Sequence, residues 1–506
     1  MTVRVDAPGL QYDINAIVKA FYPDKEIRVI EPGNDVPVTD REAGSIWMDV
    51  RVEDAVISVG RADHTYSIDP GLGAKNSFKL ALYDVMCDIT GKTLPWGNLT
   101  GVRPTKIAMA RMREGADDEQ VLEYMMSHHK VSPAKAHLAL DIAHREEDIL
   151  SRIDHRHGYS LYLNIPFCPT TCLYCSFTSY PYAAWKSRAD EYLDALFMEI
   201  DYVADDIVAG RAGIDGTAGT AGTDGDGAVR TGLCGCPDSI YIGGGTPTSL
   251  DEEHLERLLK YLTDRIDISR CLEFTCEAGR PDSITRRKLD ILKRYGVTRI
   301  SVNPQTMQQK TLDIIGRKAT PGQVIEAFRM AREAGFDNIN MDIILGLPGE
   351  GKDEVSDTLE CISELTPDSL TVHSLAIKRA SALREHLDEI GIEALVNTEE
   401  TMALAADCAR DLGMKPYYLY RQKNMSGNFE NTGYAVPGKE CIYNILIMEE
   451  VQSIVALGAG AISKRVDYKD GSASPINIER AENPKDIENY ITRTGEMIER
   501  KRALYG

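Results

Sequence analysis

The sequence has few of the features that mark membrane or secreted proteins. Among its 506 residues, no apolar run approaches the roughly 20 residues that a membrane span needs. The first residues, MTVRVDAPGL, lack a charged segment followed by an apolar stretch, so we expect no secretory signal. Basic residues are outnumbered, since 57 Lys and Arg stand against 78 Asp and Glu, a formal net charge of −21. This balance argues against general nucleic-acid binding and against docking on an anionic membrane.

The chain also lacks the even cysteine count of a disulfide framework. It holds 11 cysteines, an odd number in a long chain without an expected signal. This usage favours a protein of the reducing cytoplasm, in which some cysteines serve as ligands. Hydrophobic residues make up 43% of the chain, enough for a sizeable core. At about 150 residues per domain, the length predicts two to four domains.

Changes in pattern along the chain predict three regions. Residues 1–152 form an N-terminal accessory α/β domain, residues 153–395 a core, and residues 396–506 a C-terminal accessory region. Within the core, residues 209–232 are rich in Gly, Thr, Ala and Asp and show no apolar periodicity. Such a segment cannot repay the entropy of ordering, so we interpret it as a flexible insertion.

The core alternates strand-like runs with helical patterns, which predicts an α/β fold with a parallel sheet. The runs are SLYLNIPF, SIYIGGG, LEFTCEA, TRISVNP, INMDIILGLP and SLTVHSL. Six such units fit a partial (β/α)6 TIM-like barrel, although the pattern alone leaves a doubly wound sheet open. In either arrangement, active groups gather at the carboxyl ends of the strands.

Three cysteines follow the first of these strands. The segment YLNIPFCPTTCLYCSF places Cys168, Cys172 and Cys175 at C-x₃-C-x₂-C spacing on one short loop. Such a loop can bring three thiolates to one iron–sulfur cluster. Structural zinc normally takes four protein ligands, and no fourth Cys or His lies nearby in the sequence. Three ligands would leave one iron of a [4Fe–4S] cluster open to a further group.

The later strand ends carry further candidate binding residues. Glycines of GGGTPTSL let backbone approach a ligand closely, and the arginine of IGRKAT suits a carboxylate. Carboxylates and an amide end the third, fourth and fifth strands. The candidates are Gly244, Gly245, Thr246, Glu277, Gln305, Arg317 and Asp342.

The cysteine spacing, with Tyr174 before the third cysteine, resembles the radical S-adenosylmethionine (SAM) superfamily. The resemblance implies a radical SAM barrel with a [4Fe–4S] cluster on three cysteines and SAM on the open iron. There, one electron cleaves SAM to a radical that takes a hydrogen atom from the substrate. In their order, the motifs resemble the oxygen-independent coproporphyrinogen III oxidase family over about residues 160–465. LPWGNLTGVRPTK, EAGRPDS and YYLYRQKNMSGNFENTGY look most like its coproporphyrinogen dehydrogenase branch, HemZ type.

The resemblance also implies roles for individual residues. Cys168, Cys172 and Cys175 match the cluster ligands, while Tyr162, Gly244 and Glu277 match contacts to the cluster-bound SAM. Of these, Tyr162 and Glu277 are the expected catalytic residues. Whether a second SAM binds is open. The positions that match its surroundings are Tyr174, Gly245, Thr246, Gln305, Arg317 and Asp342, and further SAM contacts match Ala376 and Ile462.

By the same resemblance, the expected activity is the oxidative decarboxylation of coproporphyrinogen III propionates to the vinyl groups of protoporphyrinogen IX. It implies a small-molecule tetrapyrrole substrate and a reduced flavodoxin- or ferredoxin-like electron donor. The tetra-anionic substrate would need basic groups, for which Arg317, Arg421 and Lys423 are candidates. Arg421 could equally serve the packing of the domains. His373 at the sixth strand end could touch substrate, but a hydrogen-bonded histidine of the barrel is the safer interpretation. Cys234 and Cys236 could bind a second metal or exchange disulfides, but two ligands are too few to define a site.

Two departures from the family pattern keep other functions open. Asn164 stands where the family often has His, and Phe177 stands where proven oxidases often carry a further Cys. The alternatives are a haem-binding, chaperone-like protein without decarboxylase activity and a radical SAM enzyme acting on another substrate.

Overall fold

In a computed structural model, the chain divides into two compact units. The first comprises Met1–His144 with Leu419–Glu430, and the second comprises Arg145–Tyr418 with Asn431–Gly506. The three-region division expected from the sequence stays a prediction. The structure describes residues 1–23, 25–31, 47–52, 55–59, 62–69, 71–101, 103–177, 179–209, 228–229, 233, 235–376, 381, 383, 391, 395, 397–422, 425–469 and 475–505.

The first unit contains a mixed sheet covered by two helices. Its strand order is β2-β1-β3-β4-β5, in which β1 pairs in parallel with β2 and β3, and β4 pairs antiparallel with β3 and β5. Apolar residues of α1 and α2, Phe78 and Ile14 among them, pack on the sheet to form one buried core. The elements are β1 (Thr2–Val5), α1 (Gln11–Phe21), β2 (Arg28–Ile30), β3 (Trp47–Arg51), β4 (Val56–Val59), β5 (Ala62–Thr65) and α2 (Gly73–Thr90).

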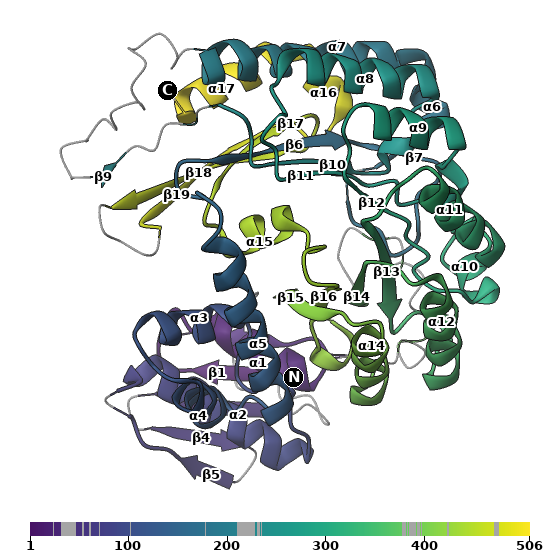
Figure 1. The fold of residues 1–506 in the computed structure, drawn as a ribbon. Coiled ribbons are helices and arrows are strands. Elements are labelled where there is room, and N and C mark those ends of the chain that lie inside the picture. Colours follow the sequence, from purple (N-terminus) through teal and green to yellow (C-terminus); the bar gives the residue numbers. More distant parts are fainter. Residues whose placement is uncertain are drawn as a thin grey trace. The chain divides into compact units, whose positions relative to one another are not determined.

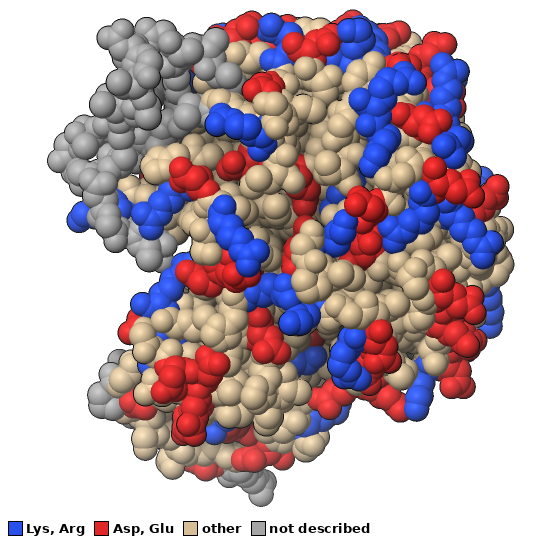
Figure 2. All heavy atoms as spheres, viewed as in Figure 1, with Lys and Arg blue, Asp and Glu red and all other residues tan. Residues whose placement is uncertain are grey.

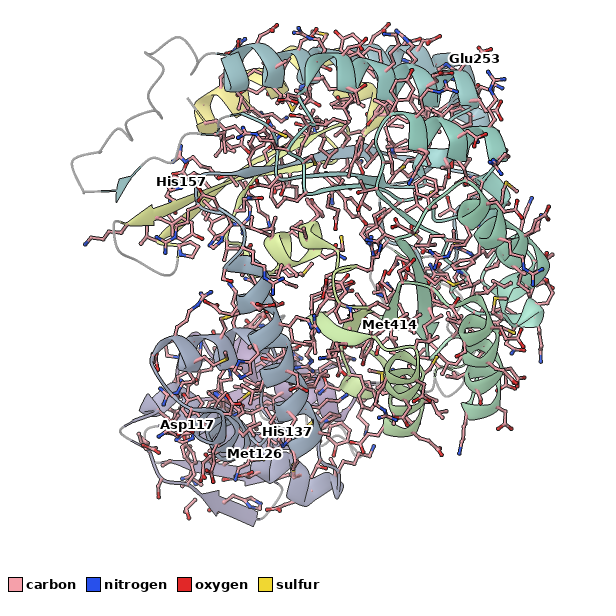
Figure 3. The ribbon with its side chains drawn as sticks, viewed as in Figure 1. Asp117, Met126, His137, His157, Glu253 and Met414 are labelled. Atoms are coloured by element: carbon pink, nitrogen blue, oxygen red, sulfur yellow. The ribbon has the colours of Figure 1, made fainter. Side chains whose placement is uncertain are left out.

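A second core of this unit gathers three helices around Trp96. These are α3 (Thr105–Arg113), α4 (Asp118–His129) and most of α5 (Pro133–Leu150). Asp117, labelled in Figure 3, caps α4 because its side chain accepts a 2.9 Å hydrogen bond from the Gln120 amide. The Trp96 indole donates to the carboxylate of Glu430 at 2.7 Å, which fastens the later segment to this core.

The second unit is built on six parallel strands that pair in chain order, as the sequence predicted. Each of the six strand-like runs forms one of them, in the order β6-β10-β11-β12-β13-β14. This is the α/β arrangement of a partial barrel, and its strand ends position the site. The strands are β6 (Tyr159–Ile165), β10 (Ser239–Gly244), β11 (Glu273–Cys276), β12 (Arg299–Ser301), β13 (Ile339–Leu345) and β14 (Ser369–Ser374).

Helices between these strands cover one face of the sheet, whereas α15 lies on the other (Figure 1). Leu255, Leu258 and Leu262 recur at helical spacing on α8 and are buried, which explains how that helix packs. The described helices that follow β6 are α6 (Tyr182–Trp185), α7 (Ala189–Tyr202), α8 (Glu252–Arg265), α9 (Arg286–Arg294), α10 (Gln309–Ile314), α11 (Pro321–Glu333), α12 (Lys352–Leu365), α14 (Glu399–Asp411), α15 (Ile442–Glu449), α16 (Ile487–Thr492) and α17 (Thr494–Tyr505).

Later strands extend both edges of the sheet. β16 pairs antiparallel with β14, and β17 pairs in parallel with β6. These strands are β15 (Lys415–Tyr420), β16 (Asn431–Ala435), β17 (Ser453–Leu457), β18 (Ile462–Lys469) and β19 (Asn477–Glu482). Short elements are β7 (Phe167–Cys168), β8 (Tyr180–Pro181), β9 (Ala228–Val229), 3-10 turns at Lys186–Arg188, Pro247–Ser249, Pro281–Ser283 and Ser426–Asn428, and a π-helical turn at Val203–Ala209.

Two expectations from the sequence fall mostly outside the described residues. Of the expected insertion at residues 209–232, the structure describes only Ala209 and β9. Cys234 and Lys423 also lie outside the described residues. Among the helices that are described, none has the length and apolar character to cross a membrane.

Candidate metal and cofactor site

The cysteine loop begins where β6 runs into β7. Backbone bonds hold this strand end against the glycine-rich turn after β10, because Gly245 N donates to Ile165 O at 2.8 Å and Thr246 N donates to Phe167 O at 2.6 Å. The Thr246 hydroxyl lies 3.6 Å from the Cys168 sulfur. Burial raises the pKa of the Cys168 thiol to about 11. The free protein therefore keeps this thiol protonated at neutral pH.

Cys172 lies between two buried arginine side chains. Its sulfur is 3.5 Å from Nη1 of Arg280 and 3.9 Å from Nη1 of Arg317. The exposed fractions are 8% for Cys172, 3% for Arg280 and 4% for Arg317. Two buried guanidinium groups therefore lie beside this sulfur, a setting that suits a ligand with negative charge.

The third cysteine and its neighbours complete the loop. Cys175 N donates to Cys172 O at 3.1 Å, and Leu173 N donates to Ile315 O at 2.9 Å, which fastens the loop to the segment after α10. Burial raises the pKa of half-buried Tyr174, which lies beside Cys172 and Arg317. Within the described ranges, no three Cys, His, Asp or Glu side chains already converge as a metal site. One shared cluster would require the three sulfur atoms to turn toward a common point.

The glycine run after β10 is packed too closely for any side chain. A Cβ at Gly245 would lie 2.5 Å from Phe167 O, and a Cβ at Gly244 would lie 1.7 Å from Oδ1 of Asn164. Gly244 also has a φ of +103°, which L side chains rarely adopt. The sequence therefore has glycine here because the strand that carries Cys168 passes directly against it.

Glu277 and Tyr162 meet inside the sheet together with two tyrosines that the sequence did not single out. The Tyr241 hydroxyl and the Gly244 amide both donate to the Glu277 carboxylate. Burial nevertheless raises the pKa of Glu277 to about 7. Tyr443 stacks on Tyr162 and Tyr241 with ring centroids 5.9 and 4.6 Å away. A carboxyl group beside these rings can change charge near neutral pH.

Oxygen atoms without partners gather where β12 ends. Ser301 Oγ, Asn303 Oδ1 and Gln305 Oε1 are buried and have no hydrogen-bond partner among the described residues. Gln305 has a φ of +68°, and its backbone still pairs with β13 through Asp342 O and the Ile344 amide. A buried polar atom without a partner is costly, so this row of acceptors suits a ligand that carries hydrogen-bond donors.

The remaining predicted site residues lie on or just after three different strands. Asp342 on β13 accepts a 2.6 Å hydrogen bond from Asn340 Nδ2 and lies 3.8 Å from Nε2 of His373. Contacts with His373 and Asn340 outweigh burial, so the pKa of Asp342 is lowered. Ala376 follows β14 and is half-buried, whereas Ile462 starts β18 and is 41% exposed.

Of the basic candidates, Arg421 is used within the first unit. Its guanidinium donates to Leu99 O and to the backbone and side-chain oxygens of Asn428, and it lies over the Trp96 ring. Burial lowers its pKa to about 10. These bonds give Arg421 a structural role. Of the three basic candidates, Arg317 is the one that the structure places at the cysteine loop.

Comparisons with known proteins show the family to which the chain belongs. The oxygen-independent coproporphyrinogen-III oxidase-like protein HemZ of Bacillus subtilis is 36% identical over 442 residues, covering 86% of this chain and 83% of that protein. This chain belongs to that HemZ-like family of radical SAM proteins. The Radical SAM superfamily model matches residues 234–362. Its match starts beyond the cysteine loop, on the other side of the 209–232 segment.

Further relatives of the HemZ-like chain match only part of it. The heme chaperone HemW of Bacillus subtilis is 35% identical over 43% of this chain and 51% of that protein. Oxygen-independent coproporphyrinogen III oxidase of Escherichia coli is 30% identical over 43% of this chain and 42% of that protein. A solved Escherichia coli structure, described as coproporphyrinogen III oxidase (HemN) and a radical SAM enzyme, superposes with a TM-score of 0.50 at 21% identity. It covers 70% of this chain and 73% of that one, which shows a shared fold.

Membership in the radical SAM superfamily implies a [4Fe–4S] cluster and SAM. The site described above fits both groups. Three thiols share one loop beside two buried arginines, as an iron–sulfur cluster prefers, and the open acceptors Asn303 and Gln305 suit a donor-rich ligand such as SAM.

Sequence reasoning missed four residues of this site. Arg280, Asn303, Tyr241 and Tyr443 were all left unassigned, although the first three stand in the quoted segments EAGRPDS, TRISVNP and SIYIGGG. Strand alternation offered a signal for two of them. Tyr241 pairs with Tyr162 across β10 and β6, and Asn303 lies two residues before Gln305. Arg280 and Tyr443 carried no such signal, because only folding brings them to Cys172 and Tyr162.

Proposed function

We propose that this HemZ-like protein is a radical SAM oxidoreductase acting on coproporphyrinogen III. In the reaction, each of two propionates loses a hydrogen atom, CO₂ and one electron, leaving the vinyl groups of protoporphyrinogen IX. The electron passes to a one-electron acceptor. The observation that carries the proposal is the loop of Cys168, Cys172 and Cys175, held at a strand end beside the turn of Gly244–Thr246 in a chain related to HemZ over most of its length.

The residues of the site would share the work as follows. Cys168, Cys172 and Cys175 hold the cluster, and Gly244, Glu277 and Tyr162 hold the amino end of SAM. The bound cluster and SAM supply one-electron cleavage of SAM and hydrogen-atom abstraction. The Glu277 carboxylate binds an ammonium more strongly than the neutral acid does, so its pKa of about 7 makes that contact sensitive to pH.

The other candidate contacts surround the same strand ends. Gln305 and Asp342 offer acceptors to a ribose, and Arg317 offers a cation to a carboxylate. These groups could surround either one SAM or a second SAM. The full set proposed for SAM contacts is Tyr162, Tyr174, Gly244, Gly245, Thr246, Glu277, Gln305, Arg317, Asp342, Ala376 and Ile462.

A one-electron reaction of this type also needs a reductant and a reducing surrounding. We propose a reduced flavodoxin- or ferredoxin-like protein as the electron donor and the cytoplasm as the compartment. The described cysteines form no disulfide, in keeping with that placement.

The test is an anaerobic assay with reduced protein, SAM and coproporphyrinogen III. We expect protoporphyrinogen IX, CO₂ and 5′-deoxyadenosine from the wild-type chain. Cys172→Ala should abolish all three, whereas Cys361→Ala, which changes a half-buried cysteine on α12, should leave them unchanged. Production of 5′-deoxyadenosine without CO₂ would reject the substrate while keeping the radical SAM class.

A haem-binding, chaperone-like function is the second candidate. One observation in its favour is the 35% identity to the heme chaperone HemW of Bacillus subtilis. The other is Phe177, which is 69% exposed and stands two residues after Cys175, where proven oxidases often carry a further Cys. Titration with haem separates the two functions. Tight binding of one haem per chain, together with no turnover of coproporphyrinogen, would favour the chaperone.

A further inference from the structure

Arg280 is a buried cation that has no role in the proposed reaction, although it stands in the segment EAGRPDS. It stands three residues after Glu277, just beyond β11, and is 3% exposed. One edge of its guanidinium forms a two-point ion pair with Asp282, with Nε to Oδ1 at 2.9 Å and Nη2 to Oδ2 at 2.8 Å. Such a pair fixes the plane and direction of the guanidinium.

The opposite edge of the guanidinium faces the cysteine loop. Nη1 donates to the Thr170 carbonyl at 3.3 Å, to the Thr170 hydroxyl at 3.1 Å and to the Cys172 sulfur at 3.5 Å. Nη2 also donates to the Thr170 hydroxyl at 3.1 Å. Thr170 lies between Cys168 and Cys172, so Arg280 fastens the segment that joins two of the proposed cluster ligands.

We infer that Arg280 is a positioning residue for the cluster, which orders the 168–172 loop and stabilises the reduced state. The inference rests on the proposed function, because it takes Cys172 as a cluster ligand. Reduction adds one negative charge to the cluster. A cation 3.5 Å from a ligand sulfur, away from water, favours the state with that extra charge.

Arg317 does not duplicate this role. It lies farther from the Cys172 sulfur, at 3.9 Å, and its Nη2 is directed to the carbonyl oxygens of Gly279 and Asn303. Only Arg280 of the two donates to Thr170. Loss of Arg280 therefore removes both a nearby charge and its hydrogen bonds to Thr170.

The experiment compares midpoint potentials of the reconstituted cluster without SAM or substrate. The variants are Arg280→Gln, Arg280→Lys and the charge control Arg286→Gln, whose side chain on α9 is 52% exposed and pairs with Asp290. Iron and sulfide per chain report loading, and electron paramagnetic resonance of the reduced cluster reports the potential. We expect a shift to more negative potential in Arg280→Gln, a smaller shift in Arg280→Lys and none in Arg286→Gln.

The outcomes separate this inference from the proposed function. Loaded Arg280 variants with the wild-type potential would overturn the inference, even if their melting temperature falls, because Arg280 would then be structural only. If Arg280→Gln does not fold, Arg280→Lys decides by the same criterion. A wild-type chain that takes up no cluster, or a Cys172→Ala variant that keeps one, would overturn the proposed ligands and this inference with them.

Discussion

Glu277 shows, at the scale of one residue, how folding changes chemistry. An exposed glutamate is an anion at neutral pH, whereas burial beside Tyr241 and Tyr162 raises the pKa of Glu277 to about 7. Its position after the third strand was predictable from the motif. Its pKa was not, because the tyrosines come from β6 and β10, far from Glu277 in the sequence.

The raised pKa makes the stability of the cofactor-free protein depend on pH. The folded chain holds a proton on Glu277 up to about pH 7, whereas the unfolded chain releases it near the ordinary glutamate pKa of 4.5, so stability falls as pH rises between these values. Above that window, the free energy of unfolding of the wild type should have fallen by at most about 3 kcal/mol. Glu277→Gln should not show this loss. Urea unfolding at several pH values measures the difference.

The matched control for this experiment is Glu253→Gln. Glu253 lies exposed on α8 (Figure 3), and its replacement should leave the pH profile of the wild type unchanged. Parallel profiles for the wild type and Glu277→Gln would contradict the raised pKa.

At the scale of elements, the turn after β10 determines where the cysteine loop can lie. Gly245 has no room for a Cβ because the carbonyl oxygens of Phe167 and Ile165 are 2.5 and 2.9 Å from that position. Both carbonyls belong to rigid backbone, so a side chain could be accommodated only by moving β7 and Cys168.

Gly245→Ala should therefore lower both stability and cluster uptake. We expect a loss of about 1–3 kcal/mol in the free energy of unfolding, as for other overpacked sites. Gly322→Ala is the control, since its Cβ would meet nothing closer than 3.9 Å and it lies in helix α11. That variant should be unchanged or slightly more stable. Equal iron content in the wild type and Gly245→Ala would contradict the expected effect of this turn on cluster uptake.

The strand elements of the second unit were the most predictable part of the fold. All six runs formed strands in the expected order. They could be predicted because parallel strands that are buried on both faces have nearly continuous apolar sequences. The short β7–β8 pair and α15 on the inner face were not foreseen. Neither has a periodic pattern of its own, and both depend on contacts with distant segments.

At the scale of the whole molecule, a buried polar cluster ties distant parts of the second unit together. Glu199 on α7 accepts from Lys501 Nζ at 2.6 Å, from the Tyr490 hydroxyl at 2.6 Å and from the Gly458 amide at 2.7 Å. Glu199 and Lys501 are 0% and 1% exposed. The C-terminal helix α17 is thereby fastened to α7.

Removing one partner of this buried pair should cost more than removing both. Lys501→Met leaves Glu199 as an uncompensated buried charge, for which we expect a loss of about 3–5 kcal/mol. The double variant Glu199→Gln with Lys501→Met should recover part of that loss. Arg500→Met, which breaks a solvent-exposed pair with Glu496, should leave stability nearly unchanged. Denaturant unfolding of the four proteins tests this order.

Although the formal net charge of the chain is −21, its basic groups are unevenly distributed. On the face shown in Figure 2, basic and acidic residues lie intermingled. Three arginines of the second unit, Arg280, Arg299 and Arg317, are instead buried, with exposed fractions of 2–4%. Two of them contact Cys172, so an acidic chain keeps positive charge at the proposed cluster.

The sequence by itself determined the α/β core, the order of its strands and the candidate cysteine ligands. Those features are local, because apolar periodicity and motif spacing are written in short segments. Only the tertiary structure decided that Arg280 reaches Cys172, that Asn303 faces the site with an unpartnered oxygen, and that Arg421 is used inside the first unit. These contacts join residues from different segments, and burial, which sets their charge and hydrogen bonding, exists only in the folded chain.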